Sequence, residues 1–135
     1  MAVMVRTTLV LENQGLRTPL GEGSGAWVEA PYSEFSQEAL RSSVRGLERM
    51  YFGRPTGLGL ADLCPELTPQ ANMLFEAVQD HLNQIEGPLR QAVRDDQVAV
   101  SDTADALGDL RIFLLADVAD KLGLVLPVFE ECDCD

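Results

Sequence analysis

The sequence has few basic residues for its length. Only 10 Lys and Arg stand against 22 Asp and Glu among 135 residues, which gives a formal net charge of −12. Neutralising a phosphate backbone requires clustered Lys and Arg, and the basic residues here are scattered along the chain. We therefore expect no nucleic acid and no anionic membrane surface as a partner.

Long apolar runs and cysteines are also scarce. No run approaches the roughly 20 residues that cross a bilayer, and residues 1–14 lack the apolar core of a signal peptide. The three cysteines, Cys64, Cys132 and Cys134, make an odd number, and the last two are too close in sequence to staple a fold. Together these absences favour a reducing compartment and predict a cytoplasmic protein. The Cys-x-Cys pair could hold a soft metal, but a solvated tail is the simpler interpretation.

The composition that remains is globular and suits one domain. Thr7 to Leu11 is a short β-branched run, and a stretch dense in Gly, Pro and Ser follows it. These features predict a strand or extended arm with a loop over residues 1–35. The pattern becomes helical over residues 36–135, so we expect an all-α domain there.

Three amphipathic helices are predicted in this domain. The first starts near Ser36, buries Leu40, Val44, Leu47 and Tyr51, and breaks at residues 52–59. The second starts at Thr68-Pro69, with Thr68 as its cap, and ends at Gly87-Pro88. Its apolar side contains Ala71, Leu74, Phe75, Val78, Leu82 and Ile85.

A helical turn over residues 89–93 and a loop over residues 94–97 precede the third helix. Ser101 or Asp102 should cap this helix, and Gly123 should end it, since Gly is favoured directly after a helix. A final short helix is expected from Pro127 to Cys132. The apolar side of the third helix contains Leu107, Leu110, Leu114, Val118 and Leu122.

Two of these helices carry acidic pairs at the same four-residue interval. Glu76 and Asp80 lie on the second helix with Gln79 and Asn83, and Asp105 and Asp109 lie on the third with Asp102 and Asp120. One interpretation is that both polar faces are solvated surfaces. The other is that the helices are antiparallel and turn these faces toward each other, so that the carboxylates hold Mg²⁺ and, through it, substrate phosphates.

The order of several segments resembles a known family. SVRGLERMYFGRP, LFEAVQDHLNQI and ADALGDLRIFLLADVADKLGLVLPVFEE follow one another over residues 37–131. This order is similar to that of the all-α nucleoside triphosphate pyrophosphohydrolases, in the MazG-like and phosphoribosyl-ATP pyrophosphohydrolase-like branch often found in phages. The resemblance implies a four-helix, bundle-like fold behind a short extended N-terminal arm, and a homodimer or homotetramer.

The resemblance also implies an activity, the Mg²⁺-dependent hydrolysis of a (deoxy)nucleoside triphosphate to the monophosphate and pyrophosphate, with Mn²⁺ as a possible substitute. It assigns the metal to Glu76, Asp80, Asp105 and Asp109, with Glu76 and Asp105 in catalytic roles. Gln79, Asn83, Arg111 and Phe113 are the expected substrate-binding residues.

This sequence departs from the family pattern at three places. Ala77 and Ala106 stand where acids are usual, and the chain ends in CDCD where relatives continue with a basic, Asn-containing stretch. Phosphate contacts would then pass to other cations, namely Arg45, Arg49, Arg54, Arg111 and Lys121. Two alternatives stay open, an inactive homologue that binds nucleotide and a module that binds a protein partner through its acidic faces. His81 as a base and Trp27 as a stacking residue are weaker candidates.

Overall fold

The computed structural model describes residues 1–17, 37–53, 57–87 and 89–125, and the fold within these ranges is all-α, as predicted. Helices account for most of the described residues, and these contain no strand. The elements in chain order are α1 (Ala2–Val10), η1 (Leu11–Arg17), α2 (Gln37–Phe52), α3 (Leu60–Leu63), η4 (Pro65–Leu67), α4 (Thr68–Gln84), α5 (Leu89–Asp95), α6 (Gln97–Phe113), η5 (Leu114–Val118) and α7 (Ala119–Lys121).

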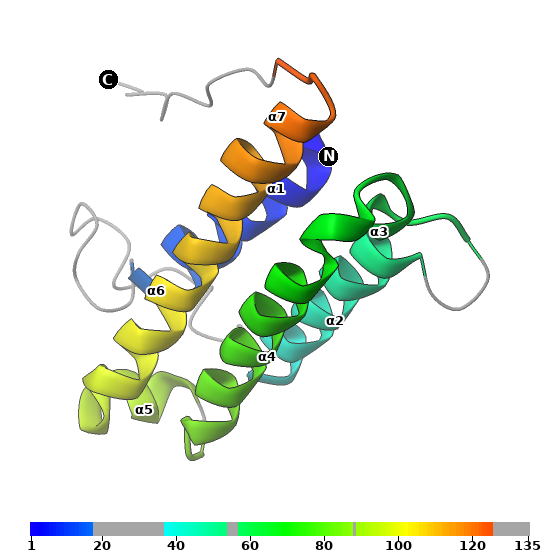
Figure 1. Cartoon of the computed structure of the whole chain (residues 1–135). Helices are drawn as coiled ribbons and strands as arrows, with labels where there is room; N and C mark the ends of the chain where they lie inside the picture. Colours follow the sequence, from blue (N-terminus) through cyan, green and yellow to red (C-terminus); the bar gives the residue numbers. More distant parts are fainter. Residues whose placement is uncertain (18–36, 54–56, 88, 126–135) are drawn as a thin grey trace, which may run out of the picture.

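The longer helical segments are α1–η1, α2, α4 and α6–α7. Figure 1 shows how they are arranged. Helices α4 and α6 lie side by side and run in opposite directions, and α2 packs against α4. The N-terminal segment α1–η1 packs along α6, which continues through the π-helical η5 into α7. One hydrophobic core joins all four segments, because buried residues of α1 and η1 belong to the same cluster as those of α2, α4 and α6.

The three predicted amphipathic helices are confirmed as α2, α4 and the α6–α7 segment. The buried residues of α2 are Leu40, Val44, Leu47 and Tyr51, the same four that the periodicity indicates. On α4 the predicted apolar side is buried except for the partly exposed Leu74. The spacing of apolar residues therefore determined which side of each helix faces the core.

The expected strand or extended arm is wrong for residues 1–17, which form α1 and the π-helical η1. Met4, Val5, Leu11 and Leu16 are buried in the core. The hydroxyl of the buried Thr8 donates to the carbonyls of Met4 and Val5 within its own helix, at 3.2 and 2.8 Å. Bonds of this kind satisfy a buried threonine, so tertiary contact with α6 overrides the strand preference of the β-branched run.

The predicted start of α4 at Thr68-Pro69 is confirmed, but the predicted caps of α4 and α6 are wrong. Thr68 makes no capping hydrogen bond, because the turn of η4 runs directly into α4 and places Leu67 at the cap position. Helix α6 begins at Gln97, where the Asp96 carboxylate accepts a hydrogen bond from the Ala99 amide at 3.3 Å. The predicted loop over residues 94–97 therefore shrinks to Asp96, and neither Ser101 nor Asp102 is a cap.

The predicted ends of the first and third helices are confirmed, whereas α4 ends at Gln84, before the predicted Gly87-Pro88. Gly53 follows α2 with φ of +70°, a conformation that favours glycine. Gly123 follows α7 with φ of +63°, and its amide and that of Leu124 donate to the carbonyls of Asp120 and Ala119. This pair of bonds is a Schellman motif, which satisfies carbonyls at the end of the helix.

The C-terminal end of α4 is held by side chains from α2. The Gln37 amide donates to the carbonyls of Leu82 and Ile85 at 3.0 and 2.6 Å, and Arg41 donates to Leu82 at 3.2 Å. The last carbonyls of a helix lack partners within the helix and carry partial negative charge. Gln37 and Arg41 therefore stabilise this end of α4 and fix its position against α2.

Aromatic side chains fill the centre of the core. The ring of Tyr51 lies 5.0 Å from Phe52, 5.9 Å from Phe75 and 6.0 Å from Phe113, measured between centroids. Tyr51 is fully buried, yet its hydroxyl has no hydrogen-bond partner among the described residues. Burial, with smaller contributions from the nearby Cys64 and Glu66, raises the pKa of this phenol from its usual 10 to about 12.

We expect Tyr51→Phe to flatten the alkaline limb of the stability profile. The unfolded chain releases the phenolic proton near pH 10, whereas the folded chain keeps it until about pH 12. The free energy of unfolding of the wild type should therefore fall, relative to that of Tyr51→Phe, between these two values. At pH 7 the variant should be at least as stable, because it loses an unpaired buried hydroxyl. Urea melts of both proteins from pH 7 to 12 measure this, and equal slopes would contradict it.

Several predictions fall on residues outside the described ranges. These are the loop with Trp27, the cation Arg54, the cysteines Cys132 and Cys134, and the final helix from Pro127 to Cys132. Among the residues that the structure does describe, none of the helices combines the length and the apolar character needed to span a membrane.

Candidate functional site

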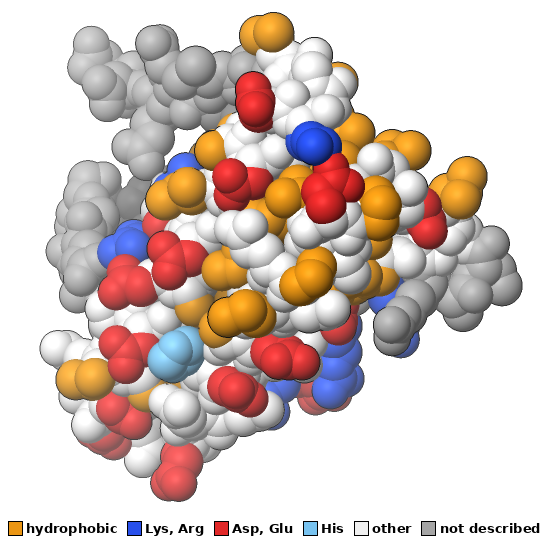
Figure 2. Space-filling view, viewed as in Figure 1, with side chains coloured by type: hydrophobic (Ala, Val, Ile, Leu, Met, Phe, Trp, Pro, Cys, Tyr) orange, Lys and Arg blue, Asp and Glu red, His pale blue; other side chains and the backbone are white. Residues whose placement is uncertain are grey.

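The two acidic pairs lie on the exposed sides of α4 and α6. Glu76, Asp80, Asp105 and Asp109 are all solvent-exposed. Figure 2 shows acidic side chains spread over the face that α4 and α6 form, with hydrophobic side chains between them. No three His, Cys, Asp or Glu within the described ranges come close enough together to hold a metal ion. The expected cleft of converging carboxylates is therefore not present among the described residues.

The polar edge of α4 turns toward α2 rather than toward α6. The Gln79 amide donates to the Glu48 carboxylate of α2 at 2.9 Å. Gln70, about 180° further round the helix, donates to Asp117 of η5 at 3.3 Å, so the α6 side lies opposite. Glu76 and Asn83 lie within about 60° of Gln79 around α4. This rotation explains why Glu76 does not meet the acids of α6.

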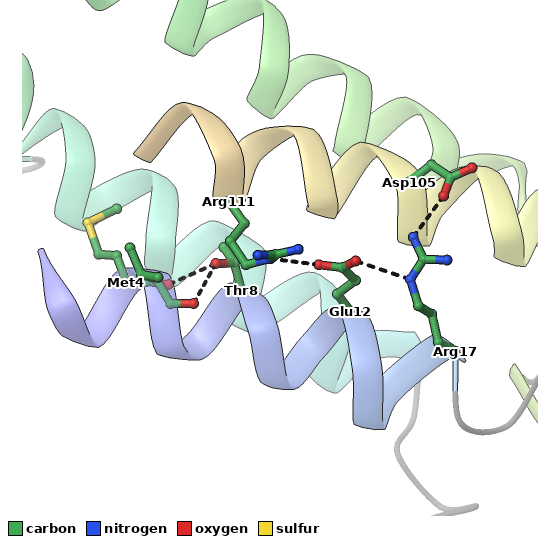
Figure 3. A network of polar contacts seen from close by, with 7 residues as sticks. Met4, Thr8, Glu12, Arg17, Asp105 and Arg111 are labelled. Carbon is green, nitrogen blue, oxygen red and sulfur yellow. Dashed lines mark hydrogen bonds and ion pairs between the residues drawn. The ribbon is translucent and has the colours of Figure 1, made fainter. Parts of the chain in front are cut away.

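Asp105 is part of a network of ion pairs that joins η1 to α6 (Figure 3). The Arg17 guanidinium donates to Asp105 at 2.9 Å and to Glu12 at 3.1 Å. The second oxygen of Glu12 accepts from the Nε of Arg111 at 2.9 Å. The Glu12 side chain is only 5% exposed, whereas that of Asp105 is 64% exposed. Glu12 is thus a buried carboxylate between two arginines.

A glycine makes room for this carboxylate on α6. A Cβ atom built at Gly108 would lie 3.2 Å from an Oε of Glu12, which is tighter than ordinary van der Waals contact. Gly108 therefore allows η1 to approach α6 closely. Within the DALGD segment, Asp105 and Gly108 both serve the packing of the N-terminal segment in this structure.

The network supplies residues that the sequence analysis missed, Glu12 and Arg17. Arg17 is 88 residues from Asp105 and Glu12 is 99 residues from Arg111, so no local spacing connects them. The available signal was Glu12 itself, a lone acid next to an apolar run that ends at Leu11. A carboxylate in a helix with few polar positions needs a cationic partner if it is buried.

The burial of Ala106 bears on why the acid before Asp109 stands at position 105. Ala106 is 8% exposed and belongs to the core, whereas Asp105 points to solvent. An acid at 106 would have to be buried in this arrangement, which is costly without a partner. An acid on the exposed side of α6 can therefore stand at position 105, four residues before Asp109, but not at position 106.

Two other candidates, Phe113 and His81, are buried and half-buried respectively. Phe113 is 2% exposed and contacts Tyr51 in the aromatic cluster, so it does not line an open nucleotide pocket and that expectation is corrected. His81 is half-buried on α4, and its Nδ1 has no hydrogen-bond partner among the described residues. Phe113 is therefore not placed to contact a ligand at the acidic pairs of α4 and α6.

The candidate phosphate-binding cations separate into two groups. Arg111 is paired with Glu12, and Lys121 donates to the exposed Glu66 at 2.7 Å. The side chains of Arg45 and Arg49 make no hydrogen bond or ion pair within the described part of the chain. These two arginines instead line a surface hollow of about 250 Å³ between α2 and α4, together with Glu48 and Gln79.

Neither protein-family models nor curated proteins nor solved structures give a significant match to the chain.

Proposed function

We propose that this chain is a nucleoside triphosphate pyrophosphohydrolase of the MazG-like type, with the four-helix, bundle-like fold of that family. The observation that carries the proposal is the placement of the two acidic pairs. Helices α4 and α6 pack side by side in opposite directions, and each presents to solvent two carboxylates four residues apart. The substrate would be a cytoplasmic (deoxy)nucleoside triphosphate, and the products the monophosphate and pyrophosphate.

Mg²⁺, or Mn²⁺, is the cofactor that the resemblance implies. Carboxylate oxygens are the right ligand type for either ion, and Glu76, Asp80 and Asp109 make no ion pair with any described residue. Their arrangement among the described residues does not fit an ion, because no three of these side chains come close enough together to hold one and Arg17 pairs with Asp105. We therefore propose that a homodimer or homotetramer forms the active site, and we assign no metal geometry to the single chain.

Asparagine substitutions on α6 test the assignment of the acidic pair. We expect Asp109→Asn and Asp105→Asn each to lower the rate of pyrophosphate release by about 100-fold or more, which corresponds to about 2.7 kcal/mol of transition-state stabilisation. Asp102→Asn, one turn before Asp105 and equally exposed, is the matched control and should keep the wild-type rate. Pyrophosphate release that is indifferent to both Asp105 and Asp109 would place the chemistry elsewhere.

A second candidate is a homologue that binds nucleotide without hydrolysing it. The observation that favours it is the Arg17–Asp105 ion pair, which engages one of the four acids inside the chain. A nucleotide that binds only the folded state raises the melting temperature by mass action. A rise in melting temperature with nucleotide, together with no pyrophosphate release, would support this candidate over the enzyme.

A further inference from the structure

The hollow between α2 and α4 has a mixed lining of two cations, a carboxylate and an amide. Arg45, Glu48 and Arg49 come from α2, and Gln79 comes from α4. Basic side chains are visible at the lower right edge of Figure 2, where α2 lies behind α4 in the same view. The hollow lies on the polar edge of α4, the side that also carries Glu76 and Asn83.

Arg45 and Arg49 are two cations of this acidic chain that line the same hollow. Their four-residue spacing places them on one side of α2, both are exposed, and neither pairs with a carboxylate of the described residues. A guanidinium offers several N–H donors in a planar fork that matches phosphate oxygens. Two such groups beside one hollow suit a dianionic or polyanionic ligand.

Glu48 and Gln79 limit which anion fits. The Gln79 amide nitrogen donates to one Glu48 oxygen, which leaves the second carboxylate oxygen and the Gln79 carbonyl as acceptors. Acceptors attract hydroxyl and N–H donors, and the charge of Glu48 repels a bare phosphate. A ligand with phosphates at one end and donors at the other, as in a nucleotide, satisfies both halves of the hollow.

We infer that the hollow between α2 and α4 binds a nucleotide, with its phosphates on Arg45 and Arg49 and its sugar or base donors on Glu48 and Gln79. The inference takes its substrate class from the proposed function, but binding at this place does not require hydrolysis. The residues that would bind the phosphates then lie between α2 and α4, and they are different from the exposed acids of α6.

Calorimetry on the full chain tests this inference, with ATP, GTP, CTP, UTP and inorganic pyrophosphate as probes. EDTA is present throughout, so that a metal-dependent reaction does not proceed. We expect the double variant Arg45→Gln/Arg49→Gln to bind the preferred triphosphate at least about tenfold more weakly than the wild type. The matched control is Arg6→Gln/Arg94→Gln. It removes two exposed arginines of α1 and α5 that form no ion pair with a described residue, and it changes net charge equally.

Glu48→Gln supplies a second readout. Removing the carboxylate charge should strengthen pyrophosphate binding and reduce the preference for nucleotide over pyrophosphate. All variants replace partly or fully exposed side chains, and their melting temperatures verify that they are folded.

Two results would overturn the inference. These are no binding of any probe to the wild type at millimolar concentration, or an equal loss of affinity in the two double variants. Either result would leave the proposed enzyme standing if the wild type still releases pyrophosphate under Mg²⁺. Conversely, Arg45- and Arg49-dependent binding without pyrophosphate release under Mg²⁺ would contradict the enzyme and leave the binding site standing.

Discussion

Glu12→Ala should lower the free energy of unfolding by about 2 to 4 kcal/mol. The carboxylate of Glu12 is almost fully buried and accepts from both Arg17 and Arg111. Breaking a buried ion pair by removing one partner typically costs about 3 to 5 kcal/mol, because the remaining charge is left unpaired. The two arginines are 31% and 27% exposed and can turn toward water, so we expect a value below the top of that range. Chemical denaturation followed by circular dichroism measures the change.

The exposed Glu76 provides the matched control for this prediction. Glu76→Ala makes the same change on a helix surface where the side chain has no ion-pair partner among the described residues, so its effect should stay within about 0.5 kcal/mol. If both substitutions have the same small effect, the network does not hold η1 against α6. Loss of stability in Glu12→Ala but not in Glu76→Ala would support a network that holds η1 against α6, where Gly108 leaves room for the Glu12 carboxylate.

Phe113→Ala should lower the free energy of unfolding by about 3 to 5 kcal/mol. Phe113 is buried next to Tyr51, and replacing a core phenylalanine with alanine loses apolar burial and leaves a cavity. Thermal or urea unfolding of the variant measures the loss. Had Phe113 formed the wall of an open nucleotide pocket, its removal would mainly weaken ligand binding.

The neighbouring Ile112 separates these two possibilities. Its side chain is 56% exposed, so Ile112→Ala should change stability by less than about 1 kcal/mol. A Phe113→Ala protein with wild-type stability but reduced nucleotide affinity would restore the pocket assignment. A large loss of stability for Phe113→Ala beside a small one for Ile112→Ala would confirm its place in the core.

The fold was predictable where local periodicity and tertiary contact agree. On α2 and α4 the apolar residues recur every three or four positions, and the structure buries those same positions. Helix α1 has no comparable pattern, because its own apolar residues are not confined to one side of the helix. Val3, Val5 and Thr7 are also β-branched, which favours a strand. Contact with α6 decides its conformation, and α6 lies about a hundred residues further along the chain.

The sequence indicated which helices carry the acids, but not how the polar sides of these helices are oriented in space. Spacing correctly indicated that the acids of α4 and α6 are exposed, yet the rotation of α4 depends on Gln79 meeting Glu48 and Gln70 meeting Asp117. These are long-range contacts without a local sequence signal. The sequence likewise suggested Asp105 as a metal ligand. Its ion pair with Arg17 depends on the packing of η1 against α6, which no local spacing indicates.

Incubation of the full-length wild-type protein with Mg²⁺ and a panel of nucleoside and deoxynucleoside triphosphates tests the proposed activity most directly. Products are resolved by anion-exchange chromatography, and pyrophosphate is assayed separately. We predict that at least one triphosphate yields monophosphate and pyrophosphate in equal amounts, and that EDTA stops the reaction. Release of orthophosphate with a diphosphate, or no turnover of any triphosphate, would contradict the proposal.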